Sequence, residues 1–207
     1  MEAYLKDPAA IYAKSFETVR AEVSLARFPD GVTDVVVRLI HACGIPAIAD
    51  DIAFTDRVVD AGRDALKSGA PIFVDANMVA AGIIRRHLTG NEIVCTLDDD
   101  GVADDAKRGA TTRSAAAVER WVPRLEGAVV AIGNAPTALF RLLELIADGA
   151  PKPAVVLGFP VGFVGAAESK DALAKSTLGL EYITLNGRIG GSAIASAAVN
   201  ALAGGLK

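Results

Sequence analysis

Apolar residues follow two alternating patterns along most of the chain. Short continuous apolar runs, rich in β-branched residues and bounded by Gly, Pro, Asn or Asp, are typical of strands that are buried on both faces. Between them lie longer stretches whose apolar positions recur every three or four residues, as expected for helices. The predicted strands cover residues 72–75, 92–97, 128–132, 154–158 and 182–185.

Glycine follows most of the predicted helices that separate these strands. Helices are expected at 55–67, 112–125, 136–147 and 192–203, and the first three are followed by Gly69, Gly127 and Gly149. Glycine is common just past a helix because the left-handed backbone conformation needed there costs it little. Strands that alternate with helices are typical of a parallel sheet covered on both sides. We therefore predict an α/β fold with a doubly wound, mostly parallel, five-stranded sheet between helices.

The first part of the chain contains no predicted strand. Residues 9–48 have the apolar spacing of helices and are expected to form an N-terminal helical segment beside the sheet. One of these helices is predicted to begin at Thr33 or Asp34 and to end at Gly44. No long polar tether separates this segment from the rest, so residues 1–207 are predicted to form a single domain.

Composition and charge restrict the classes of function. The 207 residues are 52% hydrophobic, which suffices for the core of one large domain. The formal net charge of -4 argues against nucleic acid and membrane as partners, because it provides no general attraction to phosphate groups. The 2 cysteines, Cys43 and Cys95, are expected to be reduced core thiols. Without a signal-peptide pattern or an apolar run long enough to cross a bilayer, the protein is expected to be cytoplasmic.

Three glycine-rich turns follow predicted strands, which is where α/β folds bind ligands. They lie at 133–137, 158–165 and 188–192, and amides at the helix starts there could receive a carboxylate or a phosphate. Close backbone packing explains each turn equally well. Because the dinucleotide, phosphate-loop and nucleophile-elbow signatures are missing, we predict neither a nucleotide cofactor nor covalent catalysis. The acidic residues between Asp98 and Asp105 are interpreted as a solvated loop and not as a metal site.

His41 is one of only 2 histidines and stands at the end of an apolar helical stretch. An imidazole can transfer a proton near neutral pH. In the last turn of a helix, the free backbone carbonyls would favour its charged form. The alternative is a core histidine that only hydrogen-bonds those carbonyls, and position alone slightly favours this second interpretation.

Short segments that span nearly the whole chain stand in a recognisable order. They are Ser15-Phe16, Arg38 with His41-Ala42-Cys43-Gly44, Asp75-Ala76-Asn77-Met78-Val79, Thr112-Arg113-Ser114, Gly133-Asn134-Ala135-Pro136-Thr137, Pro160-Val161-Gly162, Glu168-Ser169-Lys170, Gly190-Gly191-Ser192 and Asn200-Ala201-Leu202. In this order they resemble the precorrin-8X methylmutase (precorrin isomerase) family.

The resemblance implies an isomerase of cobalamin biosynthesis that moves a methyl group from carbon 11 to carbon 12 of precorrin-8X, giving hydrogenobyrinate, without cofactor or metal. His41 would be the catalytic histidine, supplying a proton to the macrocycle or holding one on it. A concerted shift needs a correctly charged π-system and a rigid pocket, so one histidine suffices. The substrate is an apolar disc fringed by carboxylates, which suit forked arginine donors and hydroxyl groups. The resemblance implies substrate contacts most directly for Ser15 and Arg38. The full set of candidate substrate-binding residues is Ser15, Arg20, Arg38, Met78, Arg113 and Ser114.

Several alternatives stay open at this point. The substrate could be metal-free, which the His-Ala-Cys-Gly block favours, or could carry cobalt; the protein could also bind or channel corrinoids without catalysis. An Ala-rich helix at 192–203 suggests that a homodimer is retained. Without the resemblance, Arg38 could be a surface cation and Met78 a core residue, whereas His87 is expected to face solvent. The acidic stretch at 98–109 and the apolar pair Ile83-Ile84 depart from the family pattern.

Overall fold

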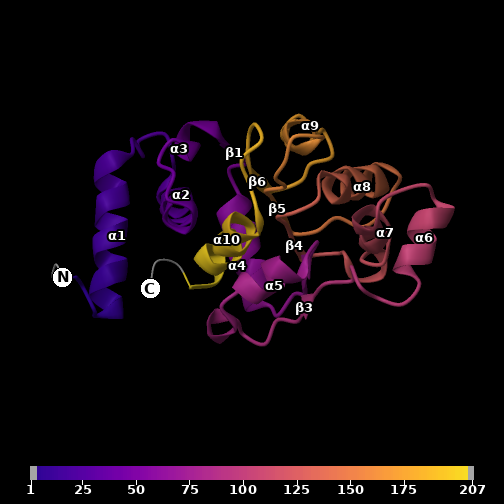
Figure 1. Ribbon diagram of the computed structural model, residues 1–207, viewed down its shortest axis with the longest axis horizontal. Helices are drawn as coiled ribbons and strands as arrows, with labels where there is room; N and C mark the ends of the chain where they lie inside the picture. Colours follow the sequence, from indigo (N-terminus) through magenta and orange to yellow (C-terminus); the bar gives the residue numbers. More distant parts are fainter. Residues whose placement is uncertain (1–3, 205–207) are drawn as a thin grey trace.

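All five predicted strands are present in the computed structural model, which describes residues 4–204, and a sixth strand joins them (Figure 1). The strands are β1 (Ile52–Phe54), β2 (Ile72–Val74), β3 (Ile93–Val94), β4 (Val129–Ile132), β5 (Val155–Gly158) and β6 (Tyr182–Leu185). Their order in the sheet is β1-β6-β5-β4-β2-β3. Every neighbouring pair is parallel except β1 and β6, so the prediction of a mostly parallel sheet is confirmed.

The prediction of five strands was wrong because it missed β1, which pairs antiparallel with β6 at the edge of the sheet. Its residues, Ile52–Phe54, directly follow the acidic pair that ends a short helix. A three-residue run without alternation or a turn signal carries too little local information to be recognised as a strand. These residues form a strand because they pair with β6, where Ile52 lies opposite Leu185.

Helices cover both faces of the sheet. They are α1 (Pro8–Glu22), α2 (Asp30–Cys43), α3 (Ile48–Asp51), α4 (Val58–Lys67), α5 (Asn77–Gly82), α6 (Val102–Arg108), α7 (Arg113–Glu119), α8 (Pro136–Ala147), α9 (Ala166–Ala174) and α10 (Ser192–Gly204), with 3-10 helices η1 (Arg85–His87) and η2 (Val122–Arg124). In Figure 1, α2, α4, α5 and α10 lie on one side of the strands and α7, α8 and α9 on the other.

Two hydrophobic clusters form the core, one on each side of the sheet. Within β4, Val129 and Ala131 belong to the cluster under α2, α4 and α10, whereas Val130 and Ile132 belong to the cluster under α7 and α8. Successive side chains of a strand point to opposite faces, so a strand covered on both sides must be apolar throughout. This arrangement explains the continuous apolar runs.

The helix predicted from residue 55 begins at Val58, and two other helix boundaries differ from the predictions where proline intervenes. The second helix begins at Asp30 and not at Thr33 or Asp34, because Pro29 stands at its N-cap with a fixed backbone angle. The stretch predicted as one helix at 112–125 is divided into α7 and η2, since Pro123 cannot donate the hydrogen bond that would continue α7. Gly44 ends α2 as predicted, with a left-handed φ of 69°.

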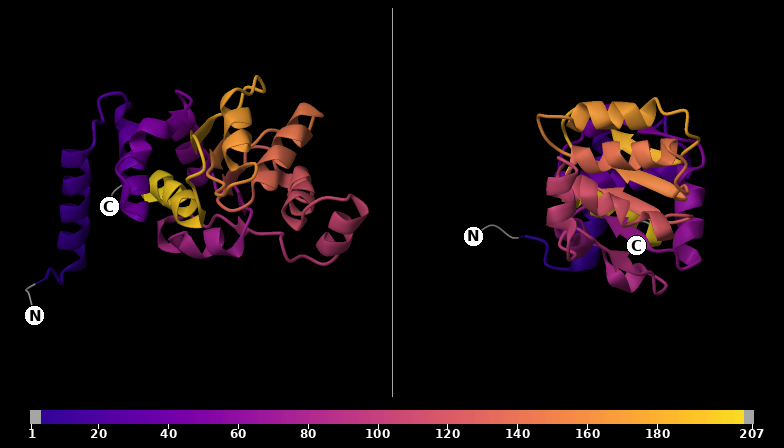
Figure 2. Two further views of the ribbon diagram at one scale, coloured as in Figure 1. Left: turned by 45° about the horizontal axis from the view of Figure 1, so that its top comes forward. Right: turned by 90° about the vertical axis from the view of Figure 1, so that its right-hand side faces the viewer.

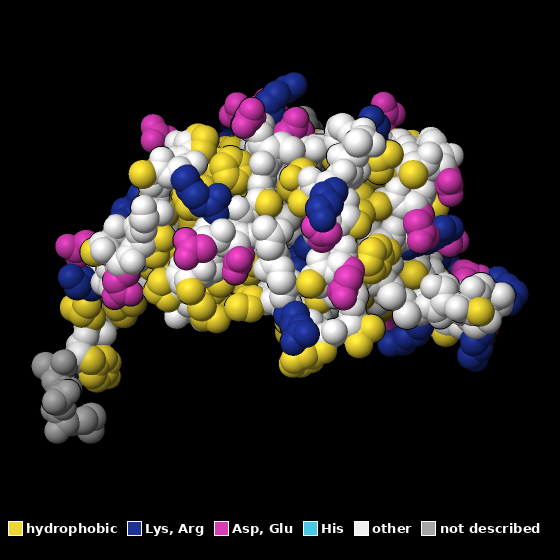
Figure 3. All heavy atoms as spheres, turned by 90° about the horizontal axis from the view of Figure 1, so that it is seen from above, with side chains coloured by type: hydrophobic (Ala, Val, Ile, Leu, Met, Phe, Trp, Pro, Cys, Tyr) yellow, Lys and Arg dark blue, Asp and Glu magenta, His cyan; other side chains and the backbone are white. Residues whose placement is uncertain are grey.

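The N-terminal helix α1 lies at one end of the elongated molecule and packs mainly against α2 (Figure 2). Basic and acidic side chains are interspersed on the face drawn in Figure 3. Among residues 4–204, no helix has both the length and the apolar character needed to cross a bilayer. The predicted single domain over 1–207 also includes residues 1–3 and 205–207, which lie outside the described residues.

Candidate active site

The glycine-rich turn after β4 is occupied by a carboxylate from the protein itself. Asp75, which is 3% exposed, accepts hydrogen bonds from the backbone N–H groups of Gly133 (2.8 Å), Asn134 (2.9 Å) and Ala135 (2.7 Å). Burial raises the pKa of Asp75, and the three N–H donors oppose that effect. The backbone N–H groups that we expected to be free for a ligand therefore bond to Asp75, and they join the end of β2 to the start of α8.

The turn after β6 is also filled by packing. A Cβ on Gly190 would overlap the carbonyl oxygens of Phe159 and Pro160, so this glycine permits a close backbone approach. Lys170, fully buried on α9, donates from Nζ to the carbonyl oxygen of Ile189 at 2.6 Å. Burial lowers the pKa of Lys170 to about 8. The glycines after β4 and β6 thus serve the fold, which supports the packing interpretation of these two turns.

His41 occupies the last turn of α2 and faces α1. Its Nδ1 lies 2.7 Å from the hydroxyl oxygen of Ser15, a hydrogen-bond distance. The rings of Tyr12 and Phe16 lie 5.2 and 5.1 Å from the imidazole, measured between centroids. Aromatic edges and faces at such distances pack favourably and restrict the ring's rotation. Three residues of α1 therefore hold one half-buried imidazole.

Two cavities meet at His41. One, of about 390 Å³, lies between α2, α5 and α10, and its lining residues are Tyr12, Arg38, His41, Ala42, Met78, Gly82, Ile84, Ala193, Ser196, Ala197 and Asn200. The other, of about 550 Å³, lies between α1 and α2 and includes Ser15, Ile40 and His41. An imidazole that borders two concave surfaces is accessible to a ligand. This position rules out the alternative of a sealed core histidine.

Arg38 is buried in the first of these cavities and is not a surface cation. It is 5% exposed, and its Nη1 is buried without a hydrogen-bond partner among the described residues. Burial of an unpaired charged nitrogen is costly, which makes the guanidinium a strong site for an anion. The cavity therefore combines a cation that lacks its partner with a histidine one helical turn away.

The pKa of His41 is lowered, contrary to the expectation drawn from its place at the end of a helix. Burial disfavours the charged ring, and the nearby positive charge of Arg38 disfavours it further. These two effects outweigh the attraction of the last backbone carbonyls for a cation. The resting imidazole is therefore neutral at neutral pH.

Asn200 is a polar residue of the cavity wall that we did not select as a site residue from the sequence. Its Oδ1 accepts from the backbone N–H of Ile84 at 2.7 Å, and its Nδ2 donates to the carbonyl oxygen of Gly82 at 2.9 Å. A Cβ on Gly82 would overlap the Ser196 side chain, so α5 and α10 approach closely here. The sequence held two signals for it, which were an asparagine in an Ala-rich helix and the segment Asn200-Ala201-Leu202 of the family resemblance.

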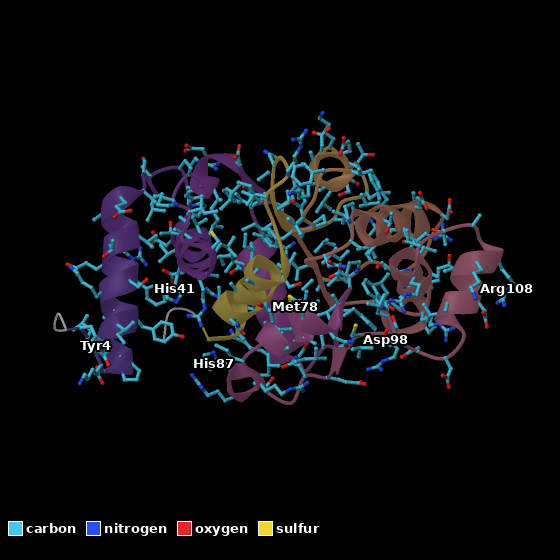
Figure 4. All side chains as sticks on the ribbon, viewed as in Figure 1. Tyr4, His41, Met78, His87, Asp98 and Arg108 are labelled. Atoms are coloured by element: carbon cyan, nitrogen blue, oxygen red, sulfur yellow. The ribbon has the colours of Figure 1, made fainter. Side chains whose placement is uncertain are left out.

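The structure does not bring all the predicted site residues to His41. Met78 lines the cavity and is 73% exposed, so it is not a core residue. Arg20 is paired with Asp34 at 2.8 Å and lines neither cavity. Arg113 and Ser114 begin α7 on the other side of the sheet, with Arg113 3.8 Å from Asp98. In Figure 4, Asp98 lies beyond Met78 as seen from His41.

The remaining sequence-based expectations have mixed outcomes. Within residues 4–204, no three His, Cys, Asp or Glu side chains are grouped to hold a metal ion, and Asp98 to Asp100 are all exposed. Of the two apolar residues that depart from the family pattern, Ile83 is buried and Ile84 lines the cavity. His87 is half-buried: its Nδ1 is enclosed and its side chain lines a cavity, so it faces solvent only in part. Both cysteines are free and half-buried against the core.

Comparisons with known proteins agree with the sequence resemblance. The family model described as precorrin-8X methylmutase matches residues 10–204. Proteins named precorrin-8X methylmutase from Sinorhizobium sp and Pseudomonas aeruginosa are 53% and 54% identical over 97% of this chain, and 96% and 97% of theirs. A protein named cobalt-precorrin-8 methylmutase from Priestia megaterium is 39% identical over 94% of this chain and 87% of its own.

A solved structure shows the same fold. The precorrin-8X methylmutase of Thermus thermophilus superposes with a TM-score of 0.85 at 41% identity, and the match covers 94% of each chain. The residues matched by the family model, 10–204, include His41 and every lining residue of the cavity that it shares with Arg38. The chain therefore belongs to the precorrin-8X methylmutase family and is an isomerase of the methylmutase class.

Proposed function

We propose that this isomerase converts precorrin-8X to hydrogenobyrinate by moving a methyl group from carbon 11 to carbon 12, with His41 as the proton donor and acceptor. The observation that carries the proposal is one cavity in which His41, held by Ser15, borders the Arg38 guanidinium, whose Nη1 has no partner among residues 4–204. A polycarboxylate supplies the anion that Arg38 lacks. An apolar macrocycle suits the alanine, isoleucine and methionine side chains of the wall.

The role of His41 follows from its hydrogen bond. If the Ser15 hydroxyl donates to Nδ1, the proton of the neutral ring is on Nε2. This group can hold a proton on the conjugated macrocycle during the shift, or exchange one with it. A substrate carboxylate on Arg38 would cancel the positive charge that lowers the pKa of His41, so binding favours the protonated donor form. Substrate binding would thus prepare the catalytic acid.

We assign substrate contacts in order of the support for them. Arg38 binds a peripheral carboxylate, Ser15 orients the imidazole, and Met78 covers the macrocycle with an exposed thioether side chain. A metal-free substrate is favoured, because the relatives named precorrin-8X methylmutase are more similar to this chain than the one named cobalt-precorrin-8 methylmutase. The cytoplasm is the proposed location of the reaction.

A homodimer would give Arg113 and Ser114 access to the substrate. Both residues lie away from His41 within one chain, but α7 of one subunit could complete the cavity of another. Arg20, paired with Asp34 at the end of α1, would then have a role at the cleft rim or the subunit contact. Mixing inactive His41→Ala and Arg113→Ala subunits should restore about a quarter of the wild-type rate if sites are shared. Recovery would be nil if each chain holds a complete site.

Substitution of His41 tests the central proposal. His41→Ala should retain the circular dichroism spectrum and abolish conversion of precorrin-8X to the corrin chromophore, because general acid–base catalysis is worth roughly 100- to 10,000-fold. Full turnover by this variant would refute the assignment. A carrier would behave differently: the absorbance change would saturate in proportion to the protein added and would show no turnover. Rates measured with a large excess of substrate separate the two.

A further inference from the structure

A third cavity, which shares no lining residue with the one that Arg38 and His41 line, has a basic lining. It has a volume of about 560 Å³ and lies between α4, η1 and the end of α10. Arg63, Lys67 and His87 contribute its ionisable groups, and Leu66 and Leu202 part of its apolar wall. None of its lining residues within the described chain is acidic. The proposed methyl shift uses none of these side chains.

Two of the polar lining residues are already satisfied by the fold. Asn91 donates from Nδ2 to the carbonyl oxygens of Leu66 and Ala70, each at 2.9 Å. Thr89 donates from its hydroxyl to the carbonyl oxygen of Leu66, also at 2.9 Å. These bonds shape the wall of the cavity and leave the ionisable side chains as its free donors.

His87 is the least satisfied of these donors. Its Nδ1 is buried and has no hydrogen-bond partner among residues 4–204. A Cβ on Gly204 would lie 2.5 Å from this nitrogen, so the last residue of α10 leaves room for the ring only because it is glycine. The Nδ1 atom is enclosed, so the part of the imidazole that a ligand can reach is the rest of the ring, which lines the cavity. A carboxylate there would favour the protonated ring.

The cations of this cavity are also unpaired, unlike many others on the molecule. Arg120, Arg124 and Arg141 each have a carboxylate within 3.0 Å. Arg63 and Lys67 have none within ion-pair distance in the part of the chain that the structure describes. Two unpaired cations and an imidazole around one concave surface form a local positive field, in a protein whose net charge is negative.

We propose that this cavity is a second binding site, which takes a carboxylate-bearing anion between the Arg63 and Lys67 side chains and the accessible part of the His87 imidazole. The site lies next to the His41 cavity along α10, because Asn200 lines one cavity and Gly204, one turn further along the same helix face, lines the other. The anion can therefore be a peripheral carboxylate of the macrocycle or a separate small polycarboxylate. Only the first of these sources depends on the function proposed above.

Titration of the histidines with citrate tests the site without any turnover. With only 2 histidines in the chain, a His41→Gln variant leaves the imidazole signals of His87 to be identified directly by NMR. Burial and the charges of Arg86 and Arg38 lower the pKa of His87 in the free protein. Bound citrate should raise that pKa, and the shift should saturate with increasing citrate.

Matched charge variants decide whether the effect is specific. Arg63→Gln should weaken citrate binding about tenfold, which is typical of losing one charge-assisted hydrogen bond. Arg57→Gln, at the exposed start of the same helix and outside the cavity, removes the same charge and should leave binding unchanged. A shift that does not saturate, or that both variants weaken equally, would overturn the proposal.

A second arm identifies the source of the carboxylate once citrate binding is established. If the macrocycle itself occupies the site, Arg63→Gln should raise KM several-fold with little change in kcat, and citrate should compete with substrate. If a separate anion occupies it, KM should be the same in Arg63→Gln and Arg57→Gln. Both results keep the site and differ only in its occupant, and the citrate result stands even if the proposed methyl shift fails.

Discussion

Replacement of Asn200 by alanine removes two hydrogen bonds that fix the wall of the His41 cavity. Asn200 is 6% exposed, and its side chain bonds both to the N–H of Ile84 and to the carbonyl oxygen of Gly82. Leaving a buried backbone group unsatisfied costs about 1–3 kcal/mol. Gly82 is exposed and Ile84 is half-buried, so water can reach both groups in the variant. We therefore expect Asn200→Ala to lower the free energy of unfolding by about 1–3 kcal/mol in total, not by twice that amount.

The same change should also affect substrate binding. Residues 82–84 connect α5 to η1, and Gly82 and Ile84 both line the cavity. A wall that is no longer fixed must be ordered when substrate binds, which raises KM more than it lowers kcat. Urea denaturation followed by circular dichroism gives the stability, and steady-state absorbance kinetics give the two constants. Both measurements can be made on the same preparation.

Thr96 offers a matched control. It is 7% exposed, its hydroxyl donates to the carbonyl oxygen of Ala117 at 2.8 Å and accepts from Nε1 of Trp121 at 2.9 Å, and it lines none of the three cavities. Thr96→Val should therefore lose a similar free energy of unfolding while KM stays unchanged. If the two variants raise KM equally, the effect of Asn200 is one of general stability and the reasoning is wrong. An Asn200→Ala protein that is as stable as the wild type would refute it as well.

Three further predictions concern buried ionisable groups. Asp75→Asn should lower the free energy of unfolding by roughly 2–4 kcal/mol in urea denaturation, because an amide nitrogen would replace one of the oxygens that accept three backbone N–H bonds; an unchanged midpoint would contradict this. Arg38→Gln should raise the pKa of His41, measured by NMR, because a positive charge that disfavours the protonated ring is removed. The folded-state pKa of His41 is depressed, so its contribution to stability is present above the unfolded pKa of about 6.5 and is lost as pH falls through the folded pKa. Below pH 6.5 the wild type should therefore lose stability with falling pH more steeply than His41→Gln, and parallel curves would oppose this assignment.

Most of the sheet could be predicted from the sequence because its strands are apolar on both faces. A run such as Val129–Ile132 has no polar position to make it ambiguous with an exposed helix, and glycines mark the helix ends beside it. Strand β1 could not be predicted, since its three residues form a strand only because β6 lies beside them. Its existence is a property of the tertiary structure and not of the local pattern.

The site shows the same division between local and tertiary information. The place of His41 in the last turn of α2 follows from the helix and from Gly44, and the predicted residues Ser15, Arg38 and Met78 do lie around it. The pKa of His41 is lowered by burial and by the nearby positive charge of Arg38, and helical spacing reveals neither of these effects. Likewise, nothing near Asp75 in the sequence indicates that its carboxylate would fill a turn 58 residues later.

Because of its position, α1 can detach in a local opening event while the sheet stays folded. This helix supplies Ser15, Tyr12 and Phe16 to the imidazole, yet it packs mainly on α2 at the end of the molecule and contributes no strand or sheet cover. Elements with few packed neighbours exchange their amide hydrogens through local opening events that leave the rest folded. Deuterium uptake in α1 should therefore be faster than in α10. On warming, the enzyme would lose its activity before its sheet melts, and the temperature at which it stops working would report the detachment of a single helix.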